Sequence, residues 1–363
     1  MATKHEQVRS HLKQLIETGS VQNGDTLPGE IELSTALAVS RNTVRHALDL
    51  LETEYELQRT PGRGTVYVGK RSEHPKVQTI GVVNSTLLVS IYPEMIHGIE
   101  DGLYHGGYTM ILANGNHDHH KERESIQRMV GQGISGLVIE PTANARLSAD
   151  DDFVKALNQL GIPIVTTGCR VDGLRASFFT MDDLWIGRRA TEYLLDRGHR
   201  RIGFVYMNDA QAGVLRYRGY LQALADAGIS PSRQWVRSFT IQDRVAQPGA
   251  QCTLEILENE RERPTAIIYF NDQTALEAYG VFDDLGLSVP SDISIIGVDN
   301  IEKTAHVEPA LTTFNHPKYL MGTMVAQMML ARVRSGADPM NYGFTVEPEL
   351  VERASVASMP SVS

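Results

Sequence analysis

Apolar residues near the start of the chain recur first at helical and then at strand spacing. Helical spacing over residues 4–18 predicts an amphipathic helix. A second, short helix is predicted over about 30–37, after a turn rich in glycine, asparagine and proline. Ser40 is suited to cap a third helix, whose apolar face comprises Val44, Ala47, Leu48 and Leu51.

Two β-prone segments follow, LQRT and TVYV, on either side of a Pro-Gly-Arg-Gly tip at 61–64. A turn-forming tip between such segments predicts a β-hairpin. The next stretch, GKRSEHPKVQ at 69–78, is polar with one proline and is typical of a linker. We therefore expect a small domain over 1–68, a linker over 69–78 and a larger domain after it.

From residue 79 onward, short apolar runs alternate with amphipathic helical stretches. Apolar runs separated by helices indicate parallel sheets that are covered by helices on both faces. The predicted fold class is therefore α/β for residues 79–355, preceded by a small helical domain. The predicted strands lie at 79–84, 108–114, 136–140, 162–167, 200–206, 265–270 and 293–298.

Composition narrows the class of protein. The chain has 363 residues, of which 42% are hydrophobic and 21% charged, so it is long enough for two or three compact units. Its only two cysteines, Cys169 and Cys252, exclude a disulfide framework and favour a reducing compartment. The sequence has neither an apolar run long enough for a membrane span nor the apolar core of a secretory signal. We therefore expect a cytoplasmic protein without a membrane partner.

The distribution of charge changes the meaning of the net charge of −10. The first 76 residues are neutral, with ten basic and ten acidic side chains, and the remainder carries the whole acidic excess. Within the neutral part, residues 57–71 hold four basic side chains and no acidic one. Because attraction to phosphate is screened beyond a Debye length, a local basic surface in an acidic protein is compatible with DNA binding.

The predicted third helix carries the residues best suited to reading DNA. Arg41 and Arg45 are four residues apart and project from the same side, with Asn42 beside them. In the major groove, arginine pairs well with guanine and asparagine with adenine. The alternative is an ordinary solvated helix face. The preceding short helix, the glycine-rich hairpin tip and the local basic charge favour DNA binding.

Three motifs in this region resemble the GntR family of bacterial repressors: GDTLPGE at 24–30, VSRNTVRHAL at 39–48 and GRGT at 62–65. The resemblance implies a winged helix-turn-helix domain. It further implies that Arg41, Asn42, Thr43 and Arg45 contact the operator, and that Lys4 and Arg63 contact phosphate or the minor groove. The chain departs from the family at Ile31, where many members have arginine, and at Tyr55, where glycine is usual.

Residues 79–355 resemble a different family, the LacI-type repressors and periplasmic sugar-binding proteins. The motifs include YHGGYTMIL at 104–112, FTMDDLWIGRRATEYLLDRGHRRIGFV at 179–205 and VPSDISIIGVDN at 289–300. The resemblance implies a sugar-binding effector and dimerisation domain of two α/β lobes with parallel sheets. The first lobe would comprise about 79–177 and 311–341, and the second about 178–310 and 342–355.

Polar residues at the ends of predicted strands are candidates for binding a sugar. Glu140, Asn271 and Asp299 each end or follow such a strand, and in open α/β sheets ligands bind at the carboxyl ends of strands. By the resemblance, Arg216, Asn271 and Asp299 hold sugar hydroxyls and Glu140 adds a carboxylate. The remaining ligand-binding candidates are His316 on the last crossover, Tyr92 as a wall of the pocket, and Asp182, with Asp183 as its rival.

A GntR-type head on a LacI-type body is the arrangement of the AraR-type arabinose-responsive repressors, and the resemblance extends from residue 4 to residue 353. It implies a repressor of L-arabinose utilisation genes that is released from its operator by the sugar. Because one such head reads only a half-site, we expect a homodimer on a near-palindromic operator.

Several alternatives stay open at this point. The effector could be another small sugar or a phosphorylated one, because Gly168 stands where relatives often supply a polar contact. A sugar-transport receptor would carry no DNA-binding head. A sugar-modifying enzyme would need a nucleophile or a cofactor loop, for which the sequence has no motif. We expect no enzyme activity, no cofactor and no metal, and the histidines among residues 117–120 are typical of a solvated turn.

Overall fold

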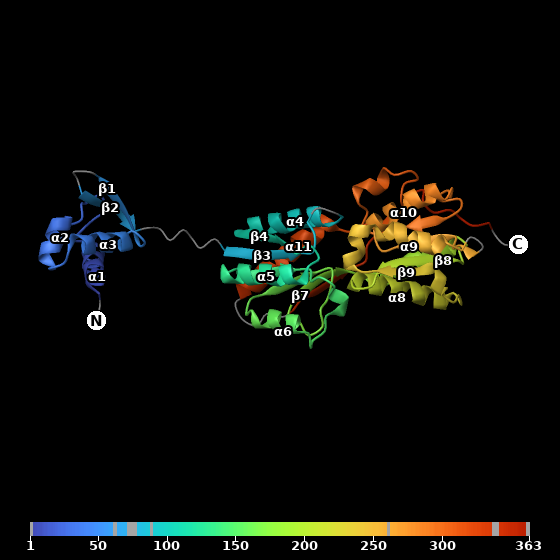
Figure 1. The fold of residues 1–363 in the computed structure, drawn as a ribbon, viewed down its shortest axis with the longest axis horizontal. Coiled ribbons are helices and arrows are strands. Elements are labelled where there is room, and N and C mark those ends of the chain that lie inside the picture. Colours follow the sequence, from blue (N-terminus) through green and yellow to red (C-terminus); the bar gives the residue numbers. More distant parts are fainter. Residues whose placement is uncertain are drawn as a thin grey trace. The chain divides into compact units, whose positions relative to one another are not determined.

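The computed structural model describes residues 3–60, 64–70, 78–87, 90–259, 262–335 and 341–360. The chain forms two compact units, Met1–Val77 and Gln78–Ser363 (Figure 1). The division falls within the predicted linker, of which residues 71–77 lie outside the described residues. None of the described helices combines the length and apolar character that a membrane crossing requires.

The first unit contains the three predicted helices and the predicted hairpin. Ser40 caps the third helix by accepting a hydrogen bond from the amide of Thr43 at 3.2 Å, as its place in the sequence predicts. The two strands are antiparallel, and the second runs two residues beyond the predicted domain end at 68. The elements are α1 (Lys4–Glu17), α2 (Glu30–Ala36), α3 (Arg41–Leu51), β1 (Tyr55–Thr60) and β2 (Gly64–Lys70).

One hydrophobic core joins these elements. The apolar stripe of α3 faces α1 and α2, and Tyr55 from the first strand closes the core beside them. This packing supplies most of the stability of such short helices, because isolated helices of this length are marginal in water. The fully buried members of the core are Val8, Leu12, Val44, Ala47 and Leu51.

The second unit is built on two parallel sheets, as the strand–helix alternation predicts. The larger sheet has the order β13-β7-β6-β5-β3-β4. Alternate residues of its strands face opposite sides: Val82 packs with α4 and α11, whereas Val83 packs with α5 and α6. The elements of this lobe are β3 (Gln78–Asn84), α4 (Tyr92–His105), β4 (Tyr108–Asn114), α5 (His119–Gly131), β5 (Gly136–Ile139), η1 (Asn144–Arg146), α6 (Asp152–Gln159), β6 (Ile164–Thr167), β7 (Ser177–Met181), α11 (Lys318–Ser335) and β13 (Gly343–Val346).

The smaller sheet has the order β11-β10-β8-β9. Helices α7 and α8 cover one of its faces and α9 and α10 the other. The elements of this lobe are α7 (Asp183–Asp196), β8 (Ile202–Met207), α8 (Gln211–Asp226), η2 (Arg233–Trp235), β9 (Val236–Phe239), η3 (Ile241–Ala246), α9 (Pro248–Leu257), β10 (Ala266–Tyr269), α10 (Asp272–Asp284), β11 (Ser294–Ile296) and η5 (Glu302–Ala305). A small antiparallel pair, β12 (Thr313–Phe314) and β14 (Leu350–Val351), lies beside them.

The crossings between the lobes correct the predicted lobe boundaries. β7 and β13 pair with each other in the larger sheet, so residues 178–181 and 342–346 belong to the first lobe, not the second. Thr312 and Asn315 form bridges to Ile296 and Asp299, so residues 311–315 lie on the second lobe. The pattern did not reveal these boundaries because β7 runs almost directly into α7, and because β13 is an edge strand with exposed side chains.

Helices α7 and α8 approach so closely that only glycine fits at their contact. A methyl group on Gly187 would lie 1.8 Å from the carbonyl oxygen of Arg216, and one on Gly219 would lie 2.1 Å from that of Leu184. Nonbonded carbon–oxygen contacts occur at roughly 3.3 Å or more, so neither methyl group could be placed without moving a helix. The contact therefore fixes the turn of α8 that carries Arg216.

We predict that Gly187→Ala lowers the free energy of unfolding by about 2 kcal/mol or more, because the added methyl group forces the two helices apart. Urea denaturation followed by circular dichroism measures the change. Gly280→Ala is the matched control: Gly280 lies within α10, and a methyl group there would meet no atom within 4 Å. The control should gain up to about 1 kcal/mol, since alanine is the better helix former. Equal stability of the two variants would contradict the packing argument.

Candidate functional site

The first unit presents the predicted DNA-reading residues on an exposed face of α3. Arg41, Asn42 and Arg45 are exposed, whereas Val44 and Leu48 on the other side of the helix are buried. Thr43 is half-buried in the first turn, and Lys4 is exposed at the start of α1. Arg63, the predicted contact at the hairpin tip, lies outside the described residues.

Ion pairs hold several basic side chains of this unit in place. Arg45 donates from Nε to both carboxylate oxygens of Glu30, each at 3.0 Å, which fixes its direction relative to α2. Arg59 of β1 pairs with Asp49 and Glu52 and so ties the hairpin to α3. Asp49 and Glu52 are therefore paired with the hairpin, whereas Glu54 is paired with Arg9 and Lys13 of α1.

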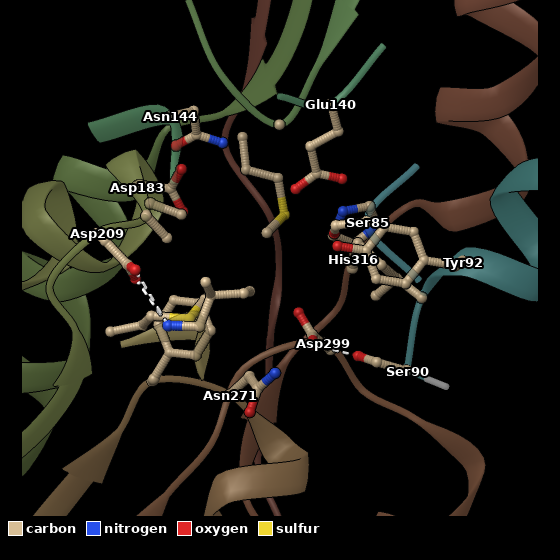
Figure 2. Close-up of a pocket in the computed structure, with 18 of the residues that line it drawn as sticks. Ser85, Ser90, Tyr92, Glu140, Asn144, Asp183, Asp209, Asn271, Asp299 and His316 are labelled. Atoms are coloured by element: carbon tan, nitrogen blue, oxygen red, sulfur yellow. Dashed lines mark hydrogen bonds between the residues drawn. The ribbon is translucent and has the colours of Figure 1, made fainter. Parts of the chain in front are cut away.

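The second unit contains a cavity between its two lobes, at the carboxyl ends of the strands of both sheets (Figure 2). Figure 2 shows the side chains of Glu140 and Tyr92 on one side of this space, with Asp183 and Asp209 on the other. The predicted ligand residues that line it are Tyr92, Glu140, Arg216, Asn271, Asp299 and His316.

The prediction of Asp182 as a lining residue is wrong, and its rival Asp183 takes that place. Asp182 is the N-cap of α7, where its Oδ1 accepts a hydrogen bond from the amide of Trp185 at 2.9 Å. An N-cap side chain turns back toward the first turn of its own helix. Asp183, the first residue of α7, lines the cavity instead.

Arg216 and Asp183 form a buried ion pair in the wall of the cavity. Arg216 donates from Nε and Nη2 to Asp183 Oδ1, each at 2.8 Å, and from Nη1 to the carbonyl oxygen of Phe270 at 2.5 Å. Burial raises the pKa of Asp183, and the neighbouring guanidinium opposes that rise. These contacts use three of the five N–H groups of arginine, so the guanidinium is oriented while it still has donors for a ligand.

Asn271 and Asp299 present opposite hydrogen-bonding groups at neighbouring strand ends. The amide oxygen of Asn271 caps α10 by accepting hydrogen bonds from the amide and hydroxyl of Thr274, so its NH2 group faces the cavity (Figure 2). Asp299 accepts a hydrogen bond from Ser90 Oγ at 2.8 Å. Its backbone has a φ of +119°, a conformation that a non-glycine residue adopts only where the surroundings hold it, often at binding sites.

His316 reaches the same cavity as a neutral imidazole. Burial, together with the charges of Lys318 and Arg216, lowers its pKa to about 3. Its Nδ1 is buried and has no hydrogen-bond partner among the residues that the structure describes. A neutral ring nitrogen without a protein partner can donate to or accept from a ligand hydroxyl.

Further polar residues line the cavity that sequence reasoning missed: Ser85, Ser90, Asn144 and Asp209. Asp209 could have been found, because it closely follows strand β8 as Asp299 follows β11. Its carboxylate is occupied by the amide of Ile241. Ser90 lies in a loop and Asn144 begins the short helix η1, and no periodicity in the sequence indicates the course of such short segments.

Several of these residues connect the lobes. Asn144 Oδ1 accepts a hydrogen bond from the amide of Gln211 at 2.7 Å. The side chain of Gln211 in turn accepts from the amide of Arg170 and donates to its carbonyl oxygen, at 2.8 and 2.9 Å. Together with the hydrogen bond from Ser90 to Asp299, these bonds hold the two lobes together, so the cleft is closed.

Comparison with known proteins extends this description. The model of the gntR family of bacterial regulatory proteins matches residues 4–66, and the model of the periplasmic binding protein-like domain matches residues 191–356. A LacI family transcriptional regulator from Enterococcus faecium, solved with bound ribose, superposes with a TM-score of 0.66 at 26% identity over 78% of this chain and 100% of that one.

Two relatives are similar over nearly the whole chain. The arabinose metabolism transcriptional repressor of Geobacillus stearothermophilus is 32% identical over 97% of this chain and 97% of its own. The repressor of the same description from Halalkalibacterium halodurans is 29% identical over 99% of this chain and 98% of its own. The chain belongs to the family of the arabinose metabolism transcriptional repressors. As a member of that family it is a DNA-binding, sugar-responsive regulator, and its relatives are regulators rather than enzymes.

We predict that Asp183→Ala lowers the free energy of unfolding by about 3–5 kcal/mol, because it leaves the buried Arg216 guanidinium without its counter-charge. Urea denaturation measures the loss. Asp226→Ala is the matched control, since Asp226 pairs with Arg188 at 2.8 Å but its side chain is 62% exposed, against 5% for Asp183. The control should lose less than about 1 kcal/mol. Similar losses in both variants would contradict the role of burial.

Proposed function

We propose that this protein is a homodimeric repressor that acts in the cytoplasm, binds a near-palindromic operator and leaves it when L-arabinose fills the cavity between its lobes. The observation that carries the proposal is the lining of that cavity. It combines an oriented guanidinium on Arg216, an amide on Asn271, a carboxylate on Asp299 and an aromatic ring on Tyr92. Adjacent sugar hydroxyls need donors and acceptors of this kind, and a sugar ring face needs an apolar wall.

The charge of the cavity favours an uncharged sugar over a phosphorylated one. Four carboxylates line it, those of Glu140, Asp183, Asp209 and Asp299. Among the described lining residues, Arg216 is the one that is cationic, and it is already paired with Asp183. A phosphate group would face an excess of negative charge in a setting of weak screening. Carboxylates are good acceptors for the hydroxyl groups of a neutral sugar.

The size of the cavity favours a monosaccharide. Its volume is about 90 Å³, which is only a few times the ~30 Å³ share of one water molecule in the liquid. A space of this size favours one small sugar ring over a disaccharide. Gly168 leaves room for the Glu140 carboxylate at the cavity wall. A Cβ atom added at Gly168 would lie 3.3 Å from Glu140 Oε1, so a larger side chain would crowd the carboxylate.

The exposed face of α3 is the proposed DNA-reading surface. We assign base and phosphate contacts to Arg41, Asn42, Thr43 and Arg45, with Lys4 and Arg63 on the flanking backbone or minor groove. A recognition helix reads one half-site, and a two-fold dimer reads two half-sites about one helical turn apart. The sugar then acts by changing how the two heads of the dimer are spaced.

The coupling between sugar and DNA follows from binding equilibria. A ligand shifts an equilibrium only by its differential affinity for the two states. The sugar must therefore bind the DNA-releasing form of the dimer better, and the operator must by reciprocity weaken sugar binding. The closed cleft, with polar groups of both lobes around one cavity, is the form that a sugar stabilises.

A gel-shift titration tests the proposal as a whole. The intact protein is incubated with its own upstream DNA and with a panel of pentoses, hexoses and pentose phosphates. We expect a shift that L-arabinose reverses. The absence of any shift at low salt would overturn the DNA-binding part, and a shift insensitive to every sugar would overturn the effector part.

We predict that Arg45→Ala weakens operator binding by about tenfold to a hundredfold, the loss expected for one direct base contact. Fluorescence anisotropy with labelled operator measures the affinity, and calorimetry with L-arabinose should find sugar binding unchanged. Lys121→Ala, which removes one positive charge from an exposed position on α5, is the control and should bind operator like the unaltered protein. An equal loss in both variants would indicate a general charge effect.

We predict the reverse phenotype for Asp299→Ala. It should bind operator normally but stay bound in the presence of L-arabinose. The reason is that the cavity loses a carboxylate, which also accepts a hydrogen bond from Ser90 across the cleft. The measurement is the sugar concentration that releases half of the operator, which should rise at least tenfold. Release at the unaltered sugar concentration would remove Asp299 from the binding site.

A further inference from the structure

Glu122 is a buried acidic residue that does not line the cavity but contacts the loop that does. It lies in the first turn of α5 and is 1% exposed. Its Oε1 accepts a hydrogen bond from the backbone amide of Thr142 at 3.0 Å. The carboxylate therefore supports the cavity wall from the side of the larger sheet.

The supported loop comprises residues 141–144, which all line the cavity. Ala143 has a φ of +49°, a left-handed conformation that costs a non-glycine residue about 1–3 kcal/mol unless its surroundings hold it. The next residue, Asn144, hydrogen bonds to the amide of Gln211 on the other lobe. The hydrogen bond at Thr142 thus lies between Glu140, the cavity carboxylate that follows β5, and the contact of Asn144 with the other lobe.

The second oxygen of Glu122 makes no comparable contact. Oε2 is buried without a hydrogen-bond partner among the described residues, and so is the hydroxyl oxygen of Thr142. The ring nitrogen Nδ1 of His119, whose side chain is half exposed, lies 3.8 Å from Oε2. Burial raises the pKa of Glu122 to about 7, although the hydrogen bond from the Thr142 amide and the charge of Arg123 oppose the rise. Cys169, two residues after β6, is a further titratable group that interacts with this carboxyl.

We propose that Glu122 is a positioning residue of the effector site: its carboxylate holds the loop of residues 141–144 in the sugar-binding conformation, and its ionisation sets the affinity for sugar. The sugar-binding part of this inference rests on the proposed function above. The anchoring of the loop does not.

The direction of the pH effect follows from the hydrogen bond. An ionised carboxylate accepts from an amide more strongly than a neutral carboxyl does, so the loop is held best when Glu122 is charged. Its charged fraction grows as the pH rises through about 7. Sugar affinity should therefore increase between about pH 6 and pH 8 to the extent that Glu122 controls it.

The titration of Asp272 must be separated from that of Glu122, because burial and the neighbouring Asp299 raise the pKa of Asp272 to about 7 as well. The comparison is therefore a ratio of dissociation constants between a variant and the unaltered protein at the same pH. The ratio cancels contributions from groups that both proteins share. It isolates the side chain at position 122.

The test is calorimetric titration of the full chain with L-arabinose at pH 6 and pH 8. Glu122→Gln keeps the shape and an acceptor for Thr142 but cannot ionise. At pH 6 its dissociation constant should be close to that of the unaltered protein. At pH 8 it should be about threefold to tenfold higher than that of the unaltered protein. Glu124→Gln is the control on the same helix, with a side chain 46% exposed, and its ratio should be near one at both values. A Glu122→Gln ratio that does not change with pH would overturn the proposal.

Thermal stability separates positioning from damage to the fold. Between about pH 4.5 and about pH 7 the native protein holds a proton on Glu122 that the unfolded chain releases, so the stability contributed by this group falls across that range and the full penalty remains above pH 7. Glu122→Gln removes that buried charge and should raise the Tm at pH 8 while it weakens sugar binding. A lowered Tm together with weaker binding would assign Glu122 a purely structural role.

Hydrogen exchange tests the anchor without any sugar. In the ligand-free protein, Glu122→Ala should speed amide exchange over residues 142–144 by about tenfold, because the Thr142 amide loses its acceptor. Unchanged exchange would overturn the anchoring role. If the unaltered protein binds no sugar but Glu122→Ala still speeds exchange in this way, the proposed effector is contradicted. The anchoring of the loop by Glu122 is then still supported.

Discussion

The buried pair of Arg216 and Asp183 is the interaction on which the cavity depends. A guanidinium taken out of water is tolerated only with a counter-charge and further acceptors in good geometry, and Asp183 and the carbonyl of Phe270 provide them. These partners come from α7 and from the end of β10, so the pair joins three elements of the second lobe. The close contact at Gly187 is the reason that α7 and α8 can bring the two charges together.

The same pair explains why the cavity is ready for a neutral polar ligand. Its partners orient the guanidinium and neutralise much of its charge before any ligand arrives, which lowers the ordering cost of binding. Around it, some polar side chains already have a protein partner: Asn271 caps α10, and Asp209 accepts from the amide of Ile241. Preorganisation of this kind suits discrimination between similar small sugars.

A few polar contacts bridge the cleft between the two lobes. Ser90, Asn144 and Gln211 bridge the lobes, and each such bond contributes only about 0.5–1.5 kcal/mol because water competes for the same groups. A bound sugar that contacts both lobes can therefore tip the balance. Ser90 lies in a loop, and the segment that leads to Asn144 is held by the buried carboxylate of Glu122.

The sequence by itself determined the periodic features. Apolar spacing located the helices of the head, the exposed face of Arg41 and Arg45, and most strands of the two sheets, because periodicity directly reflects which side is buried. Strand-end polarity and family resemblance also pointed to Glu140, Arg216, Asn271 and Asp299. Only the tertiary structure decided between Asp182 and Asp183, since adjacent residues at a helix start point in different directions and one of them must cap the helix. It likewise decided the lobe boundaries at β7 and β13 and the roles of Asn144 and Glu122, because these depend on contacts between segments far apart in the chain, which no local pattern records.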